Sequence, residues 1–207
     1  MMVTRNPLPA SASFADYFKM GIPPDEILAQ FGYGFARERL ALPHSDRLPA
    51  NLEELRINVQ TAFENVDFES EMARREFLIA PVLLAVAREI HSKVRVEWEL
   101  RVSEQLRGTL DYLLQLDGEL LIIEAKNADL TRGGTQLCVE MLALAEWRQF
   151  DKPAYFGAVS IGDVWQFAML HTAEKRIVQD TRRYAFPQDD EALFGVLFGI
   201  LEGKAIT

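Results

Sequence analysis

The dipeptide Asp117-Gly118 constrains the fold more than any other feature of this chain, because it separates two apolar runs. A type I′ turn needs φ > 0 at both central residues, and an Asp-Gly pair adopts that conformation with little strain. If these two residues form the whole loop, Leu116 pairs with Glu119. The sequence therefore predicts a β-hairpin with a defined register.

Counting back from that turn along both strands places Asp111 directly opposite Glu124. Their side chains would share one face of the hairpin, with Cβ atoms about 4.5–5.5 Å apart. Lys126 lies two residues beyond Glu124, and the alternation of side chains along a strand puts it on the same face. The register thus predicts a cluster of two acids and one lysine.

Two facing carboxylates destabilise a sheet, so the pairing of Asp111 with Glu124 favours a site for a divalent cation. Mg²⁺ is typically held by one or two carboxylates together with water and phosphate oxygens. Lys126 would then orient a nucleophilic water or stabilise charge that develops on a phosphate. The alternative is that Asp111 and Lys126 are exposed strand-end residues and that Glu124 and Lys126 are an incidental pair. Charged residues make up 26% of the chain, so the coincidence of turn, register and side-chain alternation is what favours the functional interpretation.

The composition is that of a folded protein with an acidic surface. A length of 207 residues with 49% hydrophobic content suffices for a full core, so one domain with elaborations is expected. The net charge of −9 argues against coating of nucleic acid by bulk electrostatics, but not against a metal-dependent enzyme that acts on it. No apolar run reaches the roughly 18–20 residues of a membrane span. The N-terminus lacks the apolar stretch of a secretory signal, so we expect a cytoplasmic protein without a membrane partner.

A long helix is predicted from about residue 67 to residue 90, with apolar positions at three- and four-residue steps. Pro81 lies inside this helix and should kink or divide it. Glu76 falls on the apolar stripe and Glu71 on a neighbouring face, and an acid that faces a core needs a partner or a metal. The alternative for Glu71 is an ordinary pair with Arg75, four residues later.

The rest of the chain alternates between predicted strands and helices. Residues 94–102 alternate apolar and charged side chains, which is typical of a half-exposed antiparallel strand. A loop at 127–134 and a helix at 135–149 follow the hairpin, and Gln136 near the start of that helix would face the cluster, cap the helix or be solvated. The later elements are expected to be strands at 154–161 and 164–171, a further hairpin at 175–184 and a closing helix at 189–202.

This order of elements predicts an α/β protein, an α/β/α sandwich with a central mixed β-sheet flanked by helices. Residues 1–60 carry much of the proline and glycine, and they are expected to form an N-terminal elaboration of short helices and loops. Residues 61–207 would form the core domain.

With the hairpin and its flanking helices in place, the chain resembles the PD-(D/E)xK nuclease superfamily, which has the restriction-endonuclease-like fold. The likeness covers roughly residues 68–150 and rests on Asp111, the run Glu124-Ala-Lys126, and the helices before and after them. Residues 71–83, followed by a strand of alternating charges, also resemble the opening of nuclease domains in type I restriction motor subunits.

The resemblance implies a Mg²⁺- or Mn²⁺-dependent DNA endonuclease, in which Asp111 and Glu124 bind the metal and Lys126 positions or activates the water. It also implies that a helical acid assists as a further metal ligand. Glu71 is chosen for that role by its position in the run, and Glu76 is the alternative.

Gln136 matches the place where some members of the superfamily carry a helical glutamine near the metal. Two positions depart from the pattern: Leu110 replaces the proline of the motif, and Glu140 replaces an aromatic residue that often follows that glutamine.

The competing expectation is a nuclease-fold protein with weak or no activity that serves as a nucleic-acid-binding or assembly subunit. Cutting both strands of a duplex is simplest with two sites, which favours a homodimer.

Overall fold

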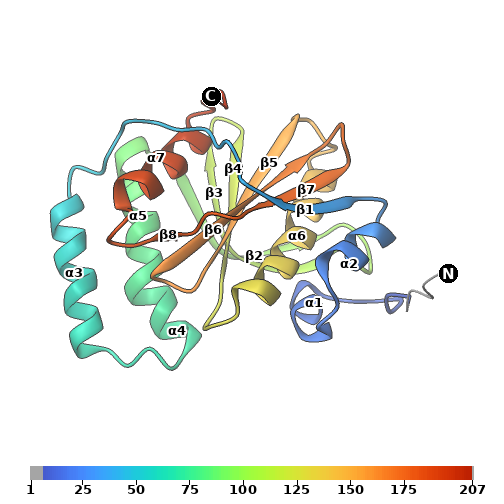
Figure 1. Ribbon diagram of the computed structural model, residues 1–207, viewed down its shortest axis with the longest axis horizontal. Coiled ribbons are helices and arrows are strands. Elements are labelled where there is room, and N and C mark those ends of the chain that lie inside the picture. The colour runs from blue at the N-terminus through green and yellow to red at the C-terminus, as the bar shows by residue number, and fades with distance from the viewer. Residues whose placement is uncertain (1–6, 207) are drawn as a thin grey trace.

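A computed structural model describes residues 7–206 and has a mixed β-sheet of eight strands at its centre (Figure 1). The strands run in the order β1-β7-β6-β5-β4-β3-β2, and the short β8 pairs with β6. β1 pairs with β7 and β4 with β5 in parallel, whereas the other neighbours are antiparallel. The bounds are β1 Gly34–Glu38, β2 Lys93–Arg101, β3 Arg107–Leu116, β4 Glu119–Ala125, β5 Ala154–Ser160, β6 Val164–His171, β7 Arg176–Asp180 and β8 Tyr184–Ala185.

Helices cover both faces of the sheet. α1, α2 and α6 pack on one face, where their apolar side chains join those of Leu113 and Ile122. α3, α5 and α7 pack on the other face with Tyr112, Leu114 and Ile123. The predicted α/β/α sandwich around a mixed sheet is confirmed. The bounds are α1 Phe14–Met20, α2 Pro24–Gln30, α3 Leu52–Asn65, α4 Glu71–Arg74, α5 Ala80–Ile90, α6 Leu130–Trp147 and α7 Asp190–Leu201.

The hairpin of β3 and β4 has the predicted turn and register. Asp117 and Gly118 have φ angles of 46° and 89°, so both adopt the left-handed conformation that a type I′ turn requires. Leu116 pairs with Glu119, and the strands stay in that register as they leave the turn. The turn therefore determines which residues face each other as far as Tyr112 and Ile123, and the predicted pairing of Asp111 with Glu124 is not part of the ladder.

β3 loses its regular pairing on both sides at Asp111. Toward β4, the ladder ends one pair earlier, at Tyr112 opposite Ile123. Toward β2, the ladder skips Glu97, whose φ is 50°. A positive φ is uncommon for a residue other than glycine and marks a locally constrained backbone. The sheet is thus loosened around the first residue of the predicted cluster.

The long helix before β2 starts later than predicted and contains a wide turn. The side chain of Ser70 caps it, so that α4 begins at Glu71. Residues 75–79 then form a π-helical turn, which ends two residues before Pro81 and interrupts the helix without breaking it. This turn disrupts the three- and four-residue periodicity, and Glu76 is exposed. The prediction that Glu76 lies on the apolar stripe is wrong.

α6 begins at Leu130, earlier than predicted, because Asp129 caps it. The carboxylate of Asp129 accepts hydrogen bonds from the backbone N–H groups of the second and third helical residues, at 3.0 and 2.9 Å. The predicted loop at 127–134 is wrong in its second half, and Gly133 and Gly134 lie inside the helix. Consecutive glycines are poor helix formers, so the sequence pattern favoured a loop.

The later elements lie close to their predicted positions. β5, β6 and α7 begin and end within one residue of the expected bounds. The further hairpin expected at 175–184 is not formed as a separate pair, because β7 and β8 both pair with β6.

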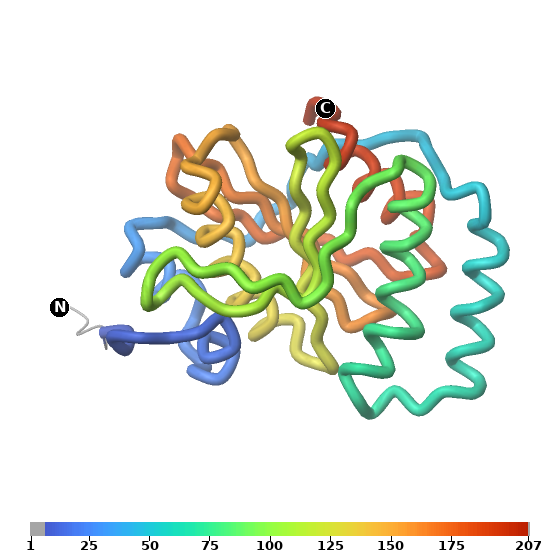
Figure 2. The backbone as a smooth tube through the Cα atoms, turned by 180° about the vertical axis from the view of Figure 1, so that it is seen from behind, coloured from blue at the N-terminus to red at the C-terminus, as the bar shows by residue number. Residues whose placement is uncertain are grey.

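The N-terminal elaboration contributes to the sheet as well as to the core. β1, a strand that the sequence did not predict, forms one edge of the sheet beside β7. The N-terminal segment lies along the loop that joins β2 to β3 (Figure 2), where Ala12 N donates to Glu104 O at 3.0 Å and Tyr17 Oη donates to Gln105 O at 2.8 Å. None of the helices in the described part of the chain is long and apolar enough to cross a membrane.

Candidate functional site

Asp111 lies where β3 separates from its neighbours. Its side chain accepts a hydrogen bond from a backbone N–H group of β4. Oδ2 of Asp111 accepts a hydrogen bond from the backbone N–H of Ala125 at 2.8 Å. The side chain of Asp111 is 16% exposed. Asp111 therefore contacts the strand that carries Glu124 through Ala125, although the ladder does not pair Asp111 with Glu124.

Glu124 and Lys126 lie side by side on the face of the sheet that α6 covers. Glu124 is completely buried, and Nζ of Lys126 forms an ion pair with Oε1 of Glu124. The backbone N–H of Lys126 donates to Ser160 O at 2.8 Å, which fixes the end of β4 against β5. The structure thus brings Asp111, Glu124 and Lys126 to one end of the hairpin.

α6 adds two buried polar residues to this group. Nε2 of Gln136 donates to Oε1 of Glu140 at 2.8 Å, and the charge of Glu140 acts on Glu124. Gln136 faces the cluster, as one of the predicted alternatives had it. Sequence reasoning noted Glu140 only as the replacement of an aromatic residue. Residues four apart lie on the same face of a helix, and that spacing is the signal by which Glu140 could have been found.

The buried carboxylates have few partners. Apart from the ion pair with Lys126, neither oxygen of Glu124 receives a hydrogen bond from a described residue, and Oε2 of Glu140 receives none either. Burial raises the pKa of Glu124 well above its usual value, and the charges of Glu140 and Asp111 raise it further. Burial also raises the pKa of Glu140 to about 7. A second cation would relieve this repulsion.

Lys126 remains a cation in spite of its burial. Burial alone lowers the pKa of Lys126, but the carboxylates of Glu124, Asp111 and Glu71 outweigh that effect and raise it. The ring centroid of Phe18, on α1, lies 5.3 Å from Nζ of Lys126. The lysine is therefore enclosed by α1 on one side and by its acidic neighbours on the other.

Glu71 lies in the first turn of α4, which is tied to the end of β4. Nε of Arg74 donates to Oδ1 of Asn127 at 3.0 Å, and Asn127 directly follows Lys126. This tie accounts for the effect of Glu71 on the pKa of Lys126. Because Glu76 is exposed, the structure favours Glu71 over Glu76 as the helical acid near the site.

Arg75 contacts the site instead of forming the alternative pair with Glu71. Its Nη1 lies 3.2 Å from Oε1 of Glu97 and 3.7 Å from Oδ1 of Asp111. Its guanidinium carbon lies 5.2 Å from the ring centroid of Tyr112. Sequence reasoning missed this residue as a member of the site. The missing signal was the position of Glu97 across from Asp111, which depends on the pairing of β2 with β3.

The acids at this end of the sheet suit a small divalent cation. Among residues 7–206, no three or more histidine, cysteine, aspartate or glutamate side chains are arranged to hold a metal ion. Asp111, Glu124 and Glu71 are therefore not assembled as three ligands. Two carboxylates are enough for Mg²⁺, which completes its shell with water and substrate oxygens. Oε1 of Glu124 is paired with Lys126, whereas Oε2 has no partner among the described residues and could serve, together with Asp111, as a ligand for such a cation.

No protein-family model matches the chain, and no curated protein or solved structure matches it significantly. The resemblance to the PD-(D/E)xK superfamily stays a prediction from the residues of the hairpin and its flanking helices. The case for a function therefore depends on the geometry of this site.

Proposed function

We propose that this protein is a Mg²⁺- or Mn²⁺-dependent nuclease that hydrolyses the DNA backbone. The observation that carries the proposal is a pair of fully buried carboxylates, Glu124 and Glu140, with the partly buried Asp111 and the ammonium of Lys126 beside them. Burial of unpaired charge is costly, and a sheet selected only for stability has no use for it. Groups with strongly perturbed pKa values gather at functional sites.

Each residue of the group has a role in this proposal. Asp111 and Glu124 would hold the cation, and Glu71, which does not join them as a third ligand, would add negative charge beside Lys126 from α4. A bound divalent cation supplies a water of lowered pKa and polarises the phosphate. Lys126, held as a cation by Glu124, donates to negative charge that develops on the phosphate oxygens. Gln136 holds the carboxylate of Glu140 in place.

A second candidate is a nuclease-fold protein that binds or assembles without cutting. The observation that favours it is the closed state of the site, in which protein groups already contact one another. Asp111 contacts Arg75 and the N–H of Ala125, and the fully buried Glu124 pairs with Lys126. Such an arrangement would join the ends of two strands without a metal.

Cleavage assays separate these two candidates. Supercoiled, linear and single-stranded DNA are incubated in Mg²⁺ or Mn²⁺ with the wild type and with Lys126→Met. We expect the variant to lose about 10²–10³-fold in rate, as enzymes do when one donor to developing charge is removed. Lys152→Met is the matched control, because Lys152 pairs with Glu119 at the opposite end of β4 and should keep the wild-type rate.

Equal rates for the wild type and Lys126→Met would overturn the chemistry assigned here. A wild type that binds DNA but cleaves none of the three substrates would instead support the role of an assembly subunit.

A further inference from the structure

A pocket of about 380 Å³ lies between α1, α2, β1 and the first turns of α6. This volume is within the range of about 300–1,000 Å³ that is usual for ligand pockets. The connection from α1 to α2 and the first residue of α2 supply an apolar wall with Ile22, Pro23 and Pro24. β1 and α6 each contribute an arginine, Arg37 and Arg132. The pocket thus combines an apolar surface with cationic groups.

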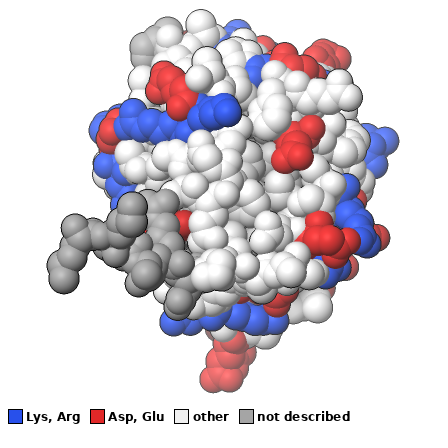
Figure 3. Space-filling model, turned by 90° about the vertical axis from the view of Figure 1, so that its right-hand side faces the viewer, with Lys and Arg blue, Asp and Glu red and all other residues white. Residues whose placement is uncertain are grey.

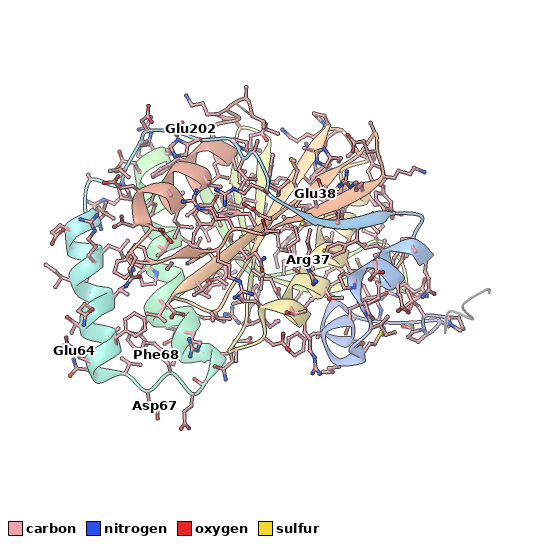
Figure 4. The ribbon with its side chains drawn as sticks, viewed as in Figure 1. Arg37, Glu38, Glu64, Asp67, Phe68 and Glu202 are labelled. Atoms are coloured by element: carbon pink, nitrogen blue, oxygen red, sulfur yellow. The ribbon has the colours of Figure 1, made fainter. Side chains whose placement is uncertain are left out.

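Arg37 is held in position by a buried residue. Gln179 is 4% exposed, and its Oε1 accepts a hydrogen bond from Nε of Arg37 at 3.1 Å. Gly134 makes room for this amide, because a Cβ on Gly134 would collide with Nε2 of Gln179. The guanidinium carbon of Arg37 lies 5.5 Å from the ring centroid of Phe35. Arg37 extends from β1 toward α6 (Figure 4).

The terminal nitrogens of Arg37 form no hydrogen bond or ion pair with a described residue. Arg132 differs, because it pairs with Asp129 at 3.4 Å. Asp129 is itself occupied with the backbone N–H groups at the start of α6, and Asp25 on α2 is the other acid in the lining. A guanidinium can donate two parallel hydrogen bonds to a phosphate. Arg37 is therefore placed to receive an anionic group.

The two kinds of surface narrow the class of ligand. A simple anion would leave the apolar wall unused, and an apolar molecule would leave the terminal nitrogens of Arg37 without a hydrogen-bond acceptor. Asp25 and the hydroxyl of Thr131 offer hydrogen bonds to a sugar or a base. A nucleotide unit, with a phosphate, a sugar and a flat base, matches all three features.

We propose that this pocket binds one nucleotide unit, with its phosphate on Arg37 and its base against the apolar wall. The source of that unit rests on the proposed nuclease function. α6 carries Arg132 and Thr135 into the pocket, while Gly133 packs against Lys126. A DNA strand with its scissile phosphate at Lys126 would thus place a neighbouring nucleotide in the pocket.

The charge on the surface around α1 and α2 is consistent with a DNA strand that is held by a few individual side chains. The face on the right-hand side of Figure 1 shows scattered charges and no broad basic area where the described residues are visible (Figure 3). Bulk attraction of the phosphate backbone has little to act on there. Binding of a DNA strand on this face would therefore depend on individual side chains that are held in position, such as Arg37.

The test is calorimetric titration in EDTA with two probes, deoxyadenosine monophosphate and a single-stranded tetradeoxyadenylate. We expect Arg37→Gln to weaken binding by about tenfold or more, which corresponds to the loss of a hydrogen bond to a charged group. Arg39→Gln is the matched control, because Arg39 is an exposed arginine just beyond β1 that does not line the pocket. Equal melting temperatures of the three proteins show that each is folded.

The pattern of losses identifies the source of the nucleotide. If Arg37→Gln binds the oligonucleotide more weakly than the wild type does, with or without weaker binding of the monophosphate, the pocket is a site for the substrate strand. If Arg37→Gln binds only the monophosphate more weakly, the pocket is a site for a free nucleotide and the link to the substrate strand is overturned.

Three results would overturn the pocket as a nucleotide site: binding of neither probe, binding that is equal in Arg37→Gln and the wild type, or inorganic phosphate that binds as tightly as the monophosphate. EDTA prevents cleavage, so these measurements are independent of the assay on Lys126→Met. The nucleotide-binding proposal can be overturned while the nuclease proposal holds, and the nuclease proposal can be overturned while the nucleotide-binding proposal holds.

Discussion

Gly133 sets the distance between α6 and the sheet at the candidate site. A Cβ on this residue would lie 2.8 Å from Cγ of Lys126 and 2.8 Å from Cγ2 of Val159. Carbon atoms in a packed core stay about 3.5–4.0 Å apart, so no larger residue fits there. The glycine weakens the helix by its backbone entropy, but it lets Gln136 and Glu140 reach the acids of β3 and β4.

We expect Gly133→Ala to lower the free energy of unfolding by about 1–3 kcal/mol, because overpacking displaces well-packed neighbours. Lys126 would move with them, so the cleavage rate should fall as well. Urea denaturation measures the first effect. Gly34→Ala is the matched control, since a Cβ on Gly34 meets its nearest neighbours at an ordinary 3.9 Å. A Gly133→Ala variant at least as stable as the wild type would contradict this account of the helix.

At the scale of elements, the π-helical turn at 75–79 determines how α4 is oriented relative to α5. A π turn holds one residue more than an α-helical turn, and such turns are frequent at functional sites. Here the extra residue allows α4 to present Glu71 toward Lys126 while α5 keeps its apolar face on the sheet. Arg75, the first residue of the turn, reaches Asp111.

Deletion of Phe77 should convert this turn into a regular α-helix. Phe77 is 45% exposed, so the protein should stay folded without it. One residue fewer rotates α4 by about 100° relative to α5, which turns Glu71 away from the site. We expect the cleavage rate to fall by about 10–100-fold, as misplacement of groups around an active site does. Phe77→Ala, which keeps the turn and removes only the side chain, should cleave at nearly the wild-type rate. Similar rates for the deletion and the substitution would show that α4 takes no part in catalysis.

At the scale of the whole molecule, the candidate site lies at the border of the apolar core that α1, α2 and α6 form with the sheet. Residues 1–60 were expected to be an elaboration, yet β1 completes the sheet, and Phe14 and Ile27 are fully buried in this core. Because these residues fold together with the site, binding at the site should stabilise the molecule as a whole.

A metal that binds the native state stabilises it by mass action. At 100 times its dissociation constant the gain is about 2.7 kcal/mol. For a domain of this size that raises the melting temperature by roughly 5–10 °C. We expect this shift with Mg²⁺ or Mn²⁺ in the wild type and its loss in Asp111→Asn, measured by thermal unfolding.

Asp117→Asn is the matched control, because Asp117 belongs to the same hairpin and asparagine also accepts its positive φ. It should show the full shift. A shift of equal size in Asp111→Asn would place the metal at some other part of the molecule.

Much of the fold and part of the candidate site could be predicted from local signals. The turn at 117–118 placed Asp111, Glu124 and Lys126 together. The prediction of a loop at 127–134 failed because the Gly133-Gly134 pair has a low helix propensity, whereas its role here is close packing against the sheet. β1 was not predicted because it pairs in parallel with β7, which is far away in the chain. Parallel strands are not joined by a tight turn, so the sequence carries no local turn signal for this pair.

The sequence by itself determined the hairpin, its register near the turn and the position of two acids and a lysine at one end of it, because turn geometry and side-chain alternation act over a few residues. The tertiary structure alone decided that Glu140 and Arg75 join this group, and that Gln179 orients Arg37 at a neighbouring pocket. These contacts join segments that are distant in sequence. Their meeting depends on how closely each helix packs on the sheet, which the long-range packing of side chains determines.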